Sequence, residues 1–156
     1  MGMSQGMPGP QVFSWPVRVY YEDTDAGGVV FYANYLRFME RARSEWLRAL
    51  GFEQPRLADD HGVLFVVRAV QIEYLKPSRF NDSLQVTVEV VNVGASRIRF
   101  SQRVLREEEG GLMQELVAAL VDVVCVTTGA FKPSRVPGAL RKKMGIKEGI
   151  KEGITE

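Results

Sequence analysis

Cysteine and histidine are nearly absent from this chain of 156 residues, which contains one of each, Cys125 and His61. A single cysteine excludes an intrachain disulfide framework and is typical of proteins in the reducing cytoplasm, where we expect this one. Cys125 lies among valines, which predicts buried packing rather than a reactive thiolate. His61 follows two aspartates in a polar segment, so we expect it at the surface. Catalysis by a Ser-His-Asp or Cys-His set therefore has no support in the sequence.

Long apolar runs and an excess of charge of either sign are also missing. No apolar run approaches the roughly 18 residues of a membrane span, and the first residues lack the pattern of a secretory signal. Lysine and arginine number 20 against 19 aspartates and glutamates, a formal net charge of +1. This balance argues against partners held by bulk attraction, such as nucleic acid or an anionic membrane. Hydrophobic residues make up 46% and charged residues 25%, as in an ordinary globular domain.

The two ends of the chain differ in composition from the rest. Glycine and proline recur within residues 1–11, which predicts a flexible leader. Residues 12–136 carry the regular patterns of one folded domain. Residues 137–156 are first basic and then repeat Lys-Glu-Gly-Ile from position 147 to position 154, which is too short for a repeat architecture. Because each glycine costs a helix about 1 kcal/mol, we expect a C-terminal helix or a disordered tail there.

A long helix is predicted in the first third of the chain. Its apolar positions recur at spacings of three and four, at Tyr35, Met39, Ala42, Trp46 and Ala49. Asn34 is suited to the N-cap, because its side-chain oxygen can accept an otherwise unpaired backbone N–H. Gly51 is a suitable stop. The helix therefore starts directly after a polar, glycine-containing turn.

This turn carries three carboxylates, on Glu22, Asp23 and Asp25. A carboxylate just ahead of a helix N-terminus lies beside unpaired N–H groups and the positive end of the helix dipole. It can attack a carbonyl group while the main chain stabilises the resulting oxyanion. Two other interpretations remain open: the aspartates shape the turn through Asx-type hydrogen bonds, or the cluster binds Ca²⁺ or Mg²⁺. The spacing lacks the repeated oxygen ligands of an EF-hand loop, so we expect no metal.

Five further segments are predicted to be β-strands, and they cover residues 13–21, 63–75, 84–93, 97–105 and 112–128. Residues 84–93 and 97–105 alternate clearly, whereas residues 63–75 are a run rich in Val, Ile and Phe, and residues 117–126 are nearly all apolar. A short helical turn ended by Gly62 is expected before the second of these strands. The last three strands are joined by short turns, which predicts an antiparallel meander. The fold class is therefore α+β, with an antiparallel sheet of about five strands wrapped around one long central helix.

The polar turn also carries a family resemblance. Its sequence from position 21 is Tyr-Glu-Asp-Thr-Asp-Ala-Gly-Gly-Val-Val-Phe-Tyr-Ala-Asn-Tyr, followed by Leu-Arg-Phe-Met-Glu-Arg-Ala-Arg. It closely resembles the signature of the 4-hydroxybenzoyl-CoA thioesterase family of hot-dog-fold proteins, and within it the YbgC-like, Tol-Pal-associated branch of acyl-CoA thioesterases. Further matches are Phe-Val-Val-Arg from position 65 and Ile-Glu-Tyr from position 72, so that the resemblance covers about residues 15–135.

The resemblance implies a hot-dog fold and an acyl-CoA thioesterase with no cofactor, coenzyme A being part of its substrate. Such proteins form homodimers by joining sheets edge to edge, often pair into homotetramers, and place active sites at the dimer interface. It assigns the catalytic carboxylate to Asp25, as nucleophile or as general base for water. The backbone N–H of Tyr32 would polarise the thioester carbonyl. Many YbgC-like members have histidine at this position, so Tyr32 excludes an imidazole role there.

Substrate-binding residues also follow from the resemblance. Gly28 lets the ligand approach the main chain closely, and Phe65 and Val66 are expected in the wall of the acyl pocket. Coenzyme A carries phosphates, for which a basic rim is expected, with these candidates: Lys76, Arg79, Arg97 and Arg99. Glu40 on the predicted helix is expected to be a solvated or salt-bridged carboxylate, since arginines lie within helical reach.

Other functions of the same fold remain open at this point. A non-catalytic module that binds acyl-CoA or an acyl-carrier protein would bind ligand without releasing thiol. A thioesterase for acyl-carrier-protein substrates would differ only in the surface around its pocket. A hot-dog dehydratase typically uses a histidine with a carboxylate, and the turn contains no histidine. The sequence thus favours hydrolysis of an acyl-CoA thioester.

Overall fold

The structure, a computed structural model of the chain, describes residues 12–145. The leader predicted for residues 1–11 and the Lys-Glu-Gly-Ile repeats at 147–154 lie outside the described residues. Of the C-terminal segment, Gly138–Lys143 forms a short helix, α3. No helix within residues 12–145 is both long enough and apolar enough to cross a membrane.

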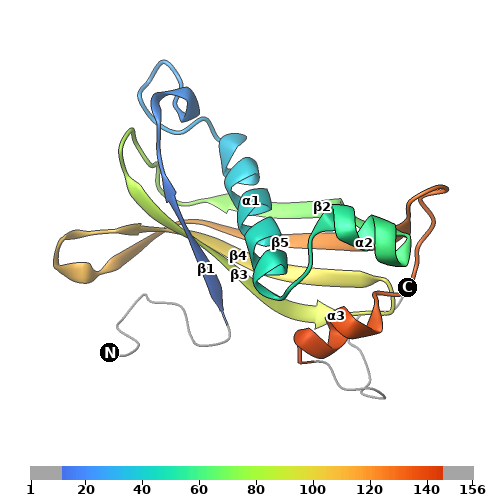
Figure 1. Cartoon of the computed structure of the whole chain (residues 1–156). Helices are drawn as coiled ribbons and strands as arrows, with labels where there is room; N and C mark the ends of the chain where they lie inside the picture. The colour runs from blue at the N-terminus through green and yellow to red at the C-terminus, as the bar shows by residue number, and fades with distance from the viewer. Residues whose placement is uncertain (1–11, 146–156) are drawn as a thin grey trace.

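One antiparallel sheet of five strands and one long helix build the domain (Figure 1). The strands are β1 (Phe13–Arg18), β2 (Val63–Tyr74), β3 (Ser83–Val93), β4 (Arg97–Glu107) and β5 (Met113–Thr127). Their order in the sheet is β1-β3-β4-β5-β2, with the predicted meander β3-β4-β5 at its centre. The helices before the meander are α1 (Asn34–Ala49) and α2 (Gln54–His61). The predicted fold class is confirmed.

Helix α1 lies across one face of the sheet, as its apolar pattern predicts (Figure 1). Phe38, Met39 and Ala42 are at most 1% exposed and pack into the core against inward residues of β3 and β4. Burial of such side chains stabilises the fold by about 1.5–3 kcal/mol for each large one. The chain turns away after the helix at Gly51, whose φ of 95° favours glycine.

The predicted N-cap of α1 is wrong. Ala33 is the N-cap, and no side chain caps the helix. Asn34 is the first helical residue, and its amide Nδ2 donates to Asp23 Oδ1 at 2.7 Å. Asparagine carries a donor as well as an acceptor, and here the nearby carboxylate engages the donor. Asn34 therefore ties the polar turn to the helix instead of capping it.

The two edges of the sheet, β1 and β2, differ. Strand β1 has six residues and contains Pro16, which cannot donate a hydrogen bond to a further strand. Strand β2 has twelve residues, and exposed apolar side chains lie along it: Val66, Val67, Val70 and Tyr74. A bulge interrupts its pairing with β5 between Val67 and Ala69. A long, apolar edge strand of this kind is a template for pairing with another chain.

Candidate active site

The polar turn folds back on itself around Asp25. The backbone N–H of Asp25 donates to Val29 O at 2.9 Å, and Gly28 N–H donates to Asp25 O at 3.0 Å. The side-chain Oδ1 of Asp25 accepts the N–H of Gly27 at 2.8 Å, an Asx-type contact. Among the described residues, the other carboxylate oxygen, Oδ2, has no hydrogen-bond partner. Asp25 is exposed in the single chain, with one oxygen oriented by the turn and the other open to a reactant.

The turn requires glycine at two positions, for different structural reasons. Gly28 has a φ of 83°, in the left-handed region that side chains rarely adopt. A Cβ at Gly27 would lie 3.3 Å from Asp25 Oδ1, a tight contact, so either the carboxylate or the main chain at position 27 would have to shift. Glycine at these positions therefore permits the turn and keeps the space around Asp25 clear.

Asp23, two residues earlier, has a structural role. Its Oδ2 accepts the N–H of Tyr20 at 2.9 Å, its Oδ1 accepts Asn34 Nδ2, and its carbonyl accepts the N–H of Phe31 at 2.9 Å. With every oxygen occupied, Asp23 fixes both ends of the turn to the start of α1. The sequence does not distinguish this residue from Asp25, because both are aspartates in the same motif.

Tyr32 contributes an unpaired backbone donor next to this turn. Within residues 12–145, its N–H makes no hydrogen bond, whereas its carbonyl accepts Tyr35 N–H at 3.3 Å and Tyr74 Oη at 3.4 Å. The rings of Tyr32 and Tyr74 meet edge to face at 5.9 Å. Partial burial, followed by the neighbouring Tyr32 and Tyr35, raises the pKa of Tyr74, so its hydroxyl remains a neutral donor at pH 7. The loop therefore holds an N–H open to an incoming oxyanion.

Tyr35 braces this region from inside. It is 3% exposed, and its hydroxyl is hydrogen-bonded to Ser78 Oγ at 2.9 Å and accepts the Ser78 N–H at 3.1 Å. Ser78 O in turn accepts the N–H of Val30 at 2.8 Å. The loop after β2 is thus attached to the polar turn. It brings Lys76 to a shallow hollow of about 250 Å³ that Tyr32 also lines.

Arg79 also lies beside the turn, since it bridges Val29 across an isolated β-type contact. Of the residues predicted from the sequence, this end of the molecule therefore brings together Asp25, Gly28, Tyr32, Lys76 and Arg79. The metal interpretation gains nothing here, because no group of three His, Cys, Asp or Glu side chains among the described residues is placed to hold an ion.

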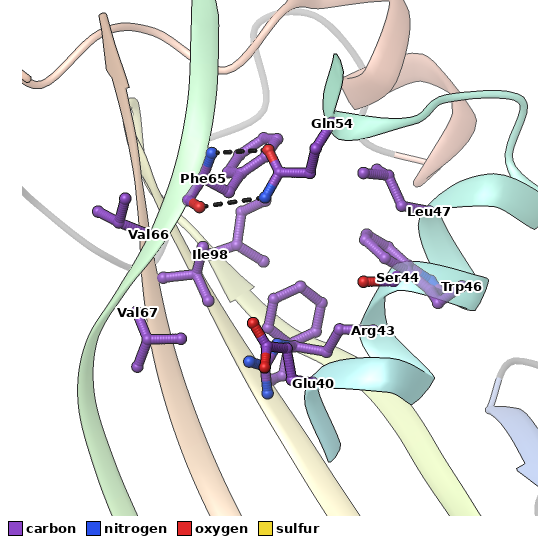
Figure 2. A pocket seen from close by; sticks show the side chains of 12 residues that line it. Glu40, Arg43, Ser44, Trp46, Leu47, Gln54, Phe65, Val66, Val67 and Ile98 are labelled. Carbon is purple, nitrogen blue, oxygen red and sulfur yellow. Dashed lines mark hydrogen bonds between the residues drawn. The ribbon is translucent and has the colours of Figure 1, made fainter. Parts of the chain in front are cut away.

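A second site lies at the other end of β2, between this strand and α1 (Figure 2). It is a cavity of about 370 Å³ with mainly apolar walls, including Trp46, Leu47, Phe65, Val67 and Phe100. Gln54 of α2 closes one side: its Oε1 accepts the Phe65 N–H at 3.0 Å, and its Nε2 donates to Phe65 O at 3.1 Å. These two bonds satisfy backbone groups of an edge strand and fix the cavity wall.

The two predicted wall residues face opposite ways. Phe65 pairs with Cys125 and Val67 with Val123, both on the face that α1 covers. Val66 borders the cavity, but Figure 2 shows its side chain directed away from it, onto the other face of the sheet. Strict alternation explains this difference. The side chains that line this wall are therefore Phe65 and Val67.

The cavity has a polar floor that the sequence interpretation missed. Glu40, Arg43 and Ser44 of α1 line it. Arg43 Nη1 donates to Gln102 Oε1 at 2.7 Å, and Gln102 is fully buried. Burial lowers the pKa of Arg43, and the Glu40 carboxylate opposes part of that effect. No ion pair links Glu40 to Arg43 in the described part of the chain. A glutamine at an inward position of β4 is the signal that could have revealed this floor.

Arg97 and Arg99 lie on the outer face of the sheet. Arg99 makes a two-pronged ion pair with Asp122, at 2.7 Å from Nε to Oδ1 and 3.0 Å from Nη2 to Oδ2. Arg97 pairs with Val124, opposite the backbone of Val66, so it lies at the cavity end of the sheet rather than beside the polar turn. Neither arginine meets Lys76 or Arg79 in one chain.

The remaining reactive residue types do not belong to either site. Cys125 is fully buried as predicted, and burial raises the pKa of its thiol to about 11. His61 is exposed at the end of α2. Carboxylate chemistry at the polar turn is the chemistry that the structure supports.

Several solved structures with this arrangement of helix and sheet are described as thioesterases. A probable thioesterase from Bartonella henselae aligns with a TM-score of 0.73 at 34% identity, over 81% of this chain and 99% of that one. The 4-hydroxybenzoyl-CoA thioesterase from Pseudomonas sp. strain CBS-3 aligns with a TM-score of 0.78 at 18% identity, over 85% of this chain and 99% of that one, a likeness of fold. The architecture is the hot-dog thioesterase fold.

Sequence comparison identifies the family. The model of the Thioesterase superfamily matches residues 27–112, which start two residues after Asp25. The acyl-CoA thioesterase YbgC of Haemophilus influenzae is 48% identical over 125 residues, 80% of this chain and 88% of that protein. The chain belongs to the thioesterase superfamily.

Proposed function

We propose that this chain is a cytoplasmic acyl-CoA thioesterase in which Asp25 and the N–H of Tyr32 act on the thioester. Water adds to the carbonyl carbon, the C–S bond breaks, and the departing sulfur takes up the proton that water loses. The products are a free acid and coenzyme A. The observation that carries the proposal is a carboxylate with one open oxygen in the same braced turn as an unpaired backbone N–H.

Asp25 can act in two ways that lead to the same products. As a general base it removes a proton from water as the water attacks. As a nucleophile it forms a mixed anhydride with the acyl group and releases the thiol first, and water then cleaves the anhydride. In both routes the carbonyl oxygen gains negative charge, which the Tyr32 N–H stabilises by about 2.7–4 kcal/mol, as an oxyanion-hole donor does.

One chain holds this chemistry and the cavity at different places. Tyr74, which contacts Tyr32, lies nine positions along β2 from Phe65 at the cavity, a span of about 30 Å in an extended strand. Figure 1 shows β2 running from α2 toward the start of α1. Asp25 is therefore too far from the cavity of its own chain to act on an acyl group bound there.

A second copy of the chain removes this separation. Two β2 strands paired antiparallel about a two-fold axis near Ala69 place Tyr74 of each protomer opposite Phe65 of the other. The axis is perpendicular to the sheet, so α1 of both protomers lies on the same side. The carboxylate of one protomer then meets the cavity of its partner. The proline in β1 and the apolar length of β2 make β2 the edge suited to this homodimer. Pairing of such dimers into tetramers stays a prediction.

The substrate is an acyl thioester of coenzyme A. The cavity of about 370 Å³ accommodates a small or medium acyl group. Two exposed basic residues lie beside the turn: Lys76 lines the hollow with Tyr32, and Arg79 pairs with Val29. Their positive charges are available to the phosphates of the coenzyme. Arg97 lies at the cavity end, so it could bind the phosphates of a coenzyme held at the polar turn only if that turn belonged to the other protomer of the dimer.

The direct test is Asp25→Asn, with thiol release measured across short-chain, long-chain and aromatic acyl-CoA thioesters. We expect kcat to fall about 10²- to 10⁴-fold, the usual contribution of a positioned acid or base, with the melting temperature and oligomeric state unchanged. Glu22→Gln, an exposed carboxylate of the same turn, is the matched control and should keep its rate. Near-normal turnover by Asp25→Asn would remove this residue from the mechanism.

A complementation experiment tests whether the site is shared between protomers. Ser44→Trp fills the cavity from an exposed position of α1 and should inactivate the enzyme while leaving Asp25 intact. Co-expression of this variant with Asp25→Asn gives heterodimers in which one site carries both defects and the other carries neither. We expect about a quarter of the wild-type activity, since about half of the dimers have one intact site. No recovery above the two single variants would place both parts of the site in one protomer.

A further inference from the structure

The cavity beside α1 is apolar on its walls but charged on its floor. This difference is unexpected for a pocket that receives a plain hydrocarbon chain, because charged groups lose hydration there without compensation. Arg43 is half-buried and borders the cavity, and one of its five N–H donors is paired, to Gln102. The following inference rests on the proposed function and concerns which acyl groups this cavity accepts.

Gln102 fixes the position of the Arg43 guanidinium. Its Nε2 donates to Met39 O at 3.1 Å and to Thr87 O at 3.2 Å, so both amide protons are used on backbone carbonyls of α1 and β3. The amide orientation is therefore determined, and Oε1 must face Arg43. Gln102 is fully buried, and no buried side-chain polar atom in the described residues lacks a partner, so every polar atom of this network is held by a hydrogen bond.

The other polar groups at the cavity differ in their availability. Both polar atoms of the Gln54 side chain are occupied by the backbone of Phe65. Glu40 and Ser44 are exposed in the single chain, and they line the floor beside the half-buried Arg43 without a hydrogen bond to it within the described residues. Glu40 and Arg43 together carry no net charge. A carboxylate in the ligand would leave one uncompensated negative charge in an apolar cavity, whereas a neutral oxygen would not.

We propose that Arg43, positioned by Gln102, is a specificity-determining residue that selects acyl groups bearing a neutral oxygen, such as a hydroxyl group, at the cavity floor. The ligand oxygen accepts an N–H of Arg43, and a ligand hydroxyl can also donate to the Glu40 carboxylate. An unsubstituted acyl chain of the same length leaves the guanidinium donors dehydrated and unpaired, which costs binding in the transition state as well as in the ground state.

The test compares ω-hydroxyacyl-CoA thioesters with alkyl thioesters of the same length, from butanoyl to octanoyl, on the intact homo-oligomer. At the best length, we expect kcat/KM for the hydroxylated substrate to exceed that of the alkyl one by about 10- to 100-fold, as for a hydrogen bond to a charged group. In Arg43→Met the ratio should fall to about 1. Arg41→Met, an exposed arginine of the same helix, should keep the wild-type ratio.

A double variant guards against misfolding. Arg43→Met leaves Gln102 Oε1 buried without a donor, whereas Arg43→Met with Gln102→Met replaces both partners by apolar groups, a change that can be nearly neutral for stability. The double variant should also lose the preference. A wild-type ratio near 1, an unchanged ratio in the folded variants, or better turnover of half-thioesters of dicarboxylic acids would overturn the inference. Turnover of the alkyl thioesters reports separately on the proposed hydrolysis.

Discussion

The two ends of strand β2 are built in different ways. At the Tyr74 end the polar turn is held by main-chain hydrogen bonds, and the group offered to a reactant is itself a backbone N–H. At the Phe65 end the cavity is formed by packed side chains and by the Arg43–Gln102 pair. A donor supplied by the main chain survives replacement of its own side chain, whereas a pocket made of side chains changes with each substitution.

This contrast explains why Tyr32 is compatible with the proposed mechanism although relatives of the predicted branch often carry histidine there. The N–H that would stabilise the oxyanion does not depend on the side chain. If the acyl group binds in the cavity as proposed, its preference would depend on side chains of the lining, among them Phe65, Val67 and Arg43. Substitutions at either end, and one that should disconnect the two ends, can separate their contributions.

Val70→Lys should have the largest effect. Val70 is 38% exposed on the edge strand, near the proposed two-fold axis, where two lysines would face one another. A like-charge pair at an interface costs several kcal/mol, so we expect the dimer to weaken by at least about 100-fold and activity at low enzyme concentration to be lost. Sedimentation and turnover as functions of concentration measure both. Pro16→Lys on the opposite edge is the control; a Val70→Lys protein that stays dimeric would show that β2 is not the interface.

Tyr32→Pro should affect only the polar-turn end. Asn34 N–H donates to Phe31 O at 2.8 Å, so Tyr32 occupies the second position of a turn, where proline is favoured. The substitution should remove the N–H with little change in backbone shape and lower kcat about 10²- to 10³-fold at unchanged KM. Tyr32→Phe keeps the N–H and should change kcat less than about threefold. Equal losses of kcat in both variants would show that the Tyr32 side chain, and not its N–H, contributes to catalysis.

Gln54→Ala should affect only the cavity end. It removes two hydrogen bonds to the Phe65 backbone, each contributing about 1 kcal/mol, and loosens the cavity wall. We expect an increase in KM for acyl-CoA and a fall of a few degrees in melting temperature, with kcat changed little. Arg56→Ala, on the same helix and exposed, should change neither. A fall in kcat without a change in KM would link the wall to the chemical step.

The smallest effect is expected for Asp122→Asn, a change in the pH dependence of stability. Asp122 lies on the outer face of the sheet, away from both ends of β2. The hydrogen bond from Arg99, with the charges of Arg99, Arg68 and Arg97, holds the pKa of Asp122 below its ordinary value, although burial opposes this. A carboxyl group with a lowered folded-state pKa stabilises the fold above its unfolded-state pKa and loses that contribution as pH falls through the folded-state pKa. The free energy of unfolding of the wild-type protein, measured with denaturant, should therefore fall below about pH 4. The free energy of unfolding of Asp122→Asn should fall less steeply over the same pH range. Identical pH profiles would exclude this contribution.

The fold could be predicted from the sequence because its periodicities are strong and local. The 3.6-residue pattern of α1 and the alternation in β3 and β4 specify their own buried faces, and the apolar run of β5 is typical of a strand with neighbours on both sides. The role of Asn34 could not be predicted, because its side chain has both a donor and an acceptor, and only the folded turn shows which is used. Alternation requires Phe65 and Val66 to face opposite ways, but which of them faces the cavity could not be predicted, because residues 63–67 are apolar at both odd and even positions.

The candidate site was predictable where residues are close in sequence, as with Asp25, Gly28 and Tyr32. The grouping of Lys76 and Arg79 with them depends on Tyr35 and Ser78, which join segments 43 residues apart. Arg43 and Gln102 are 59 residues apart, and although a glutamine on the inward face of β4 is a signal, the sequence does not show which side chain it meets. Such long-range pairs exist only once the helix lies on the sheet.

The bulge between Val67 and Ala69 has one more consequence. In an uninterrupted strand, odd-numbered positions share one side and even-numbered positions the other. Phe65 and Val67 are odd, whereas Ile72 and Tyr74 are even, yet all four lie on the side of α1. A single additional residue exchanges the parity halfway along the strand. In the proposed dimer, an uninterrupted strand would turn either Phe65 or Tyr74 to the face away from α1, so the carboxylate of one protomer and the cavity of its partner would lie on opposite faces of the sheet.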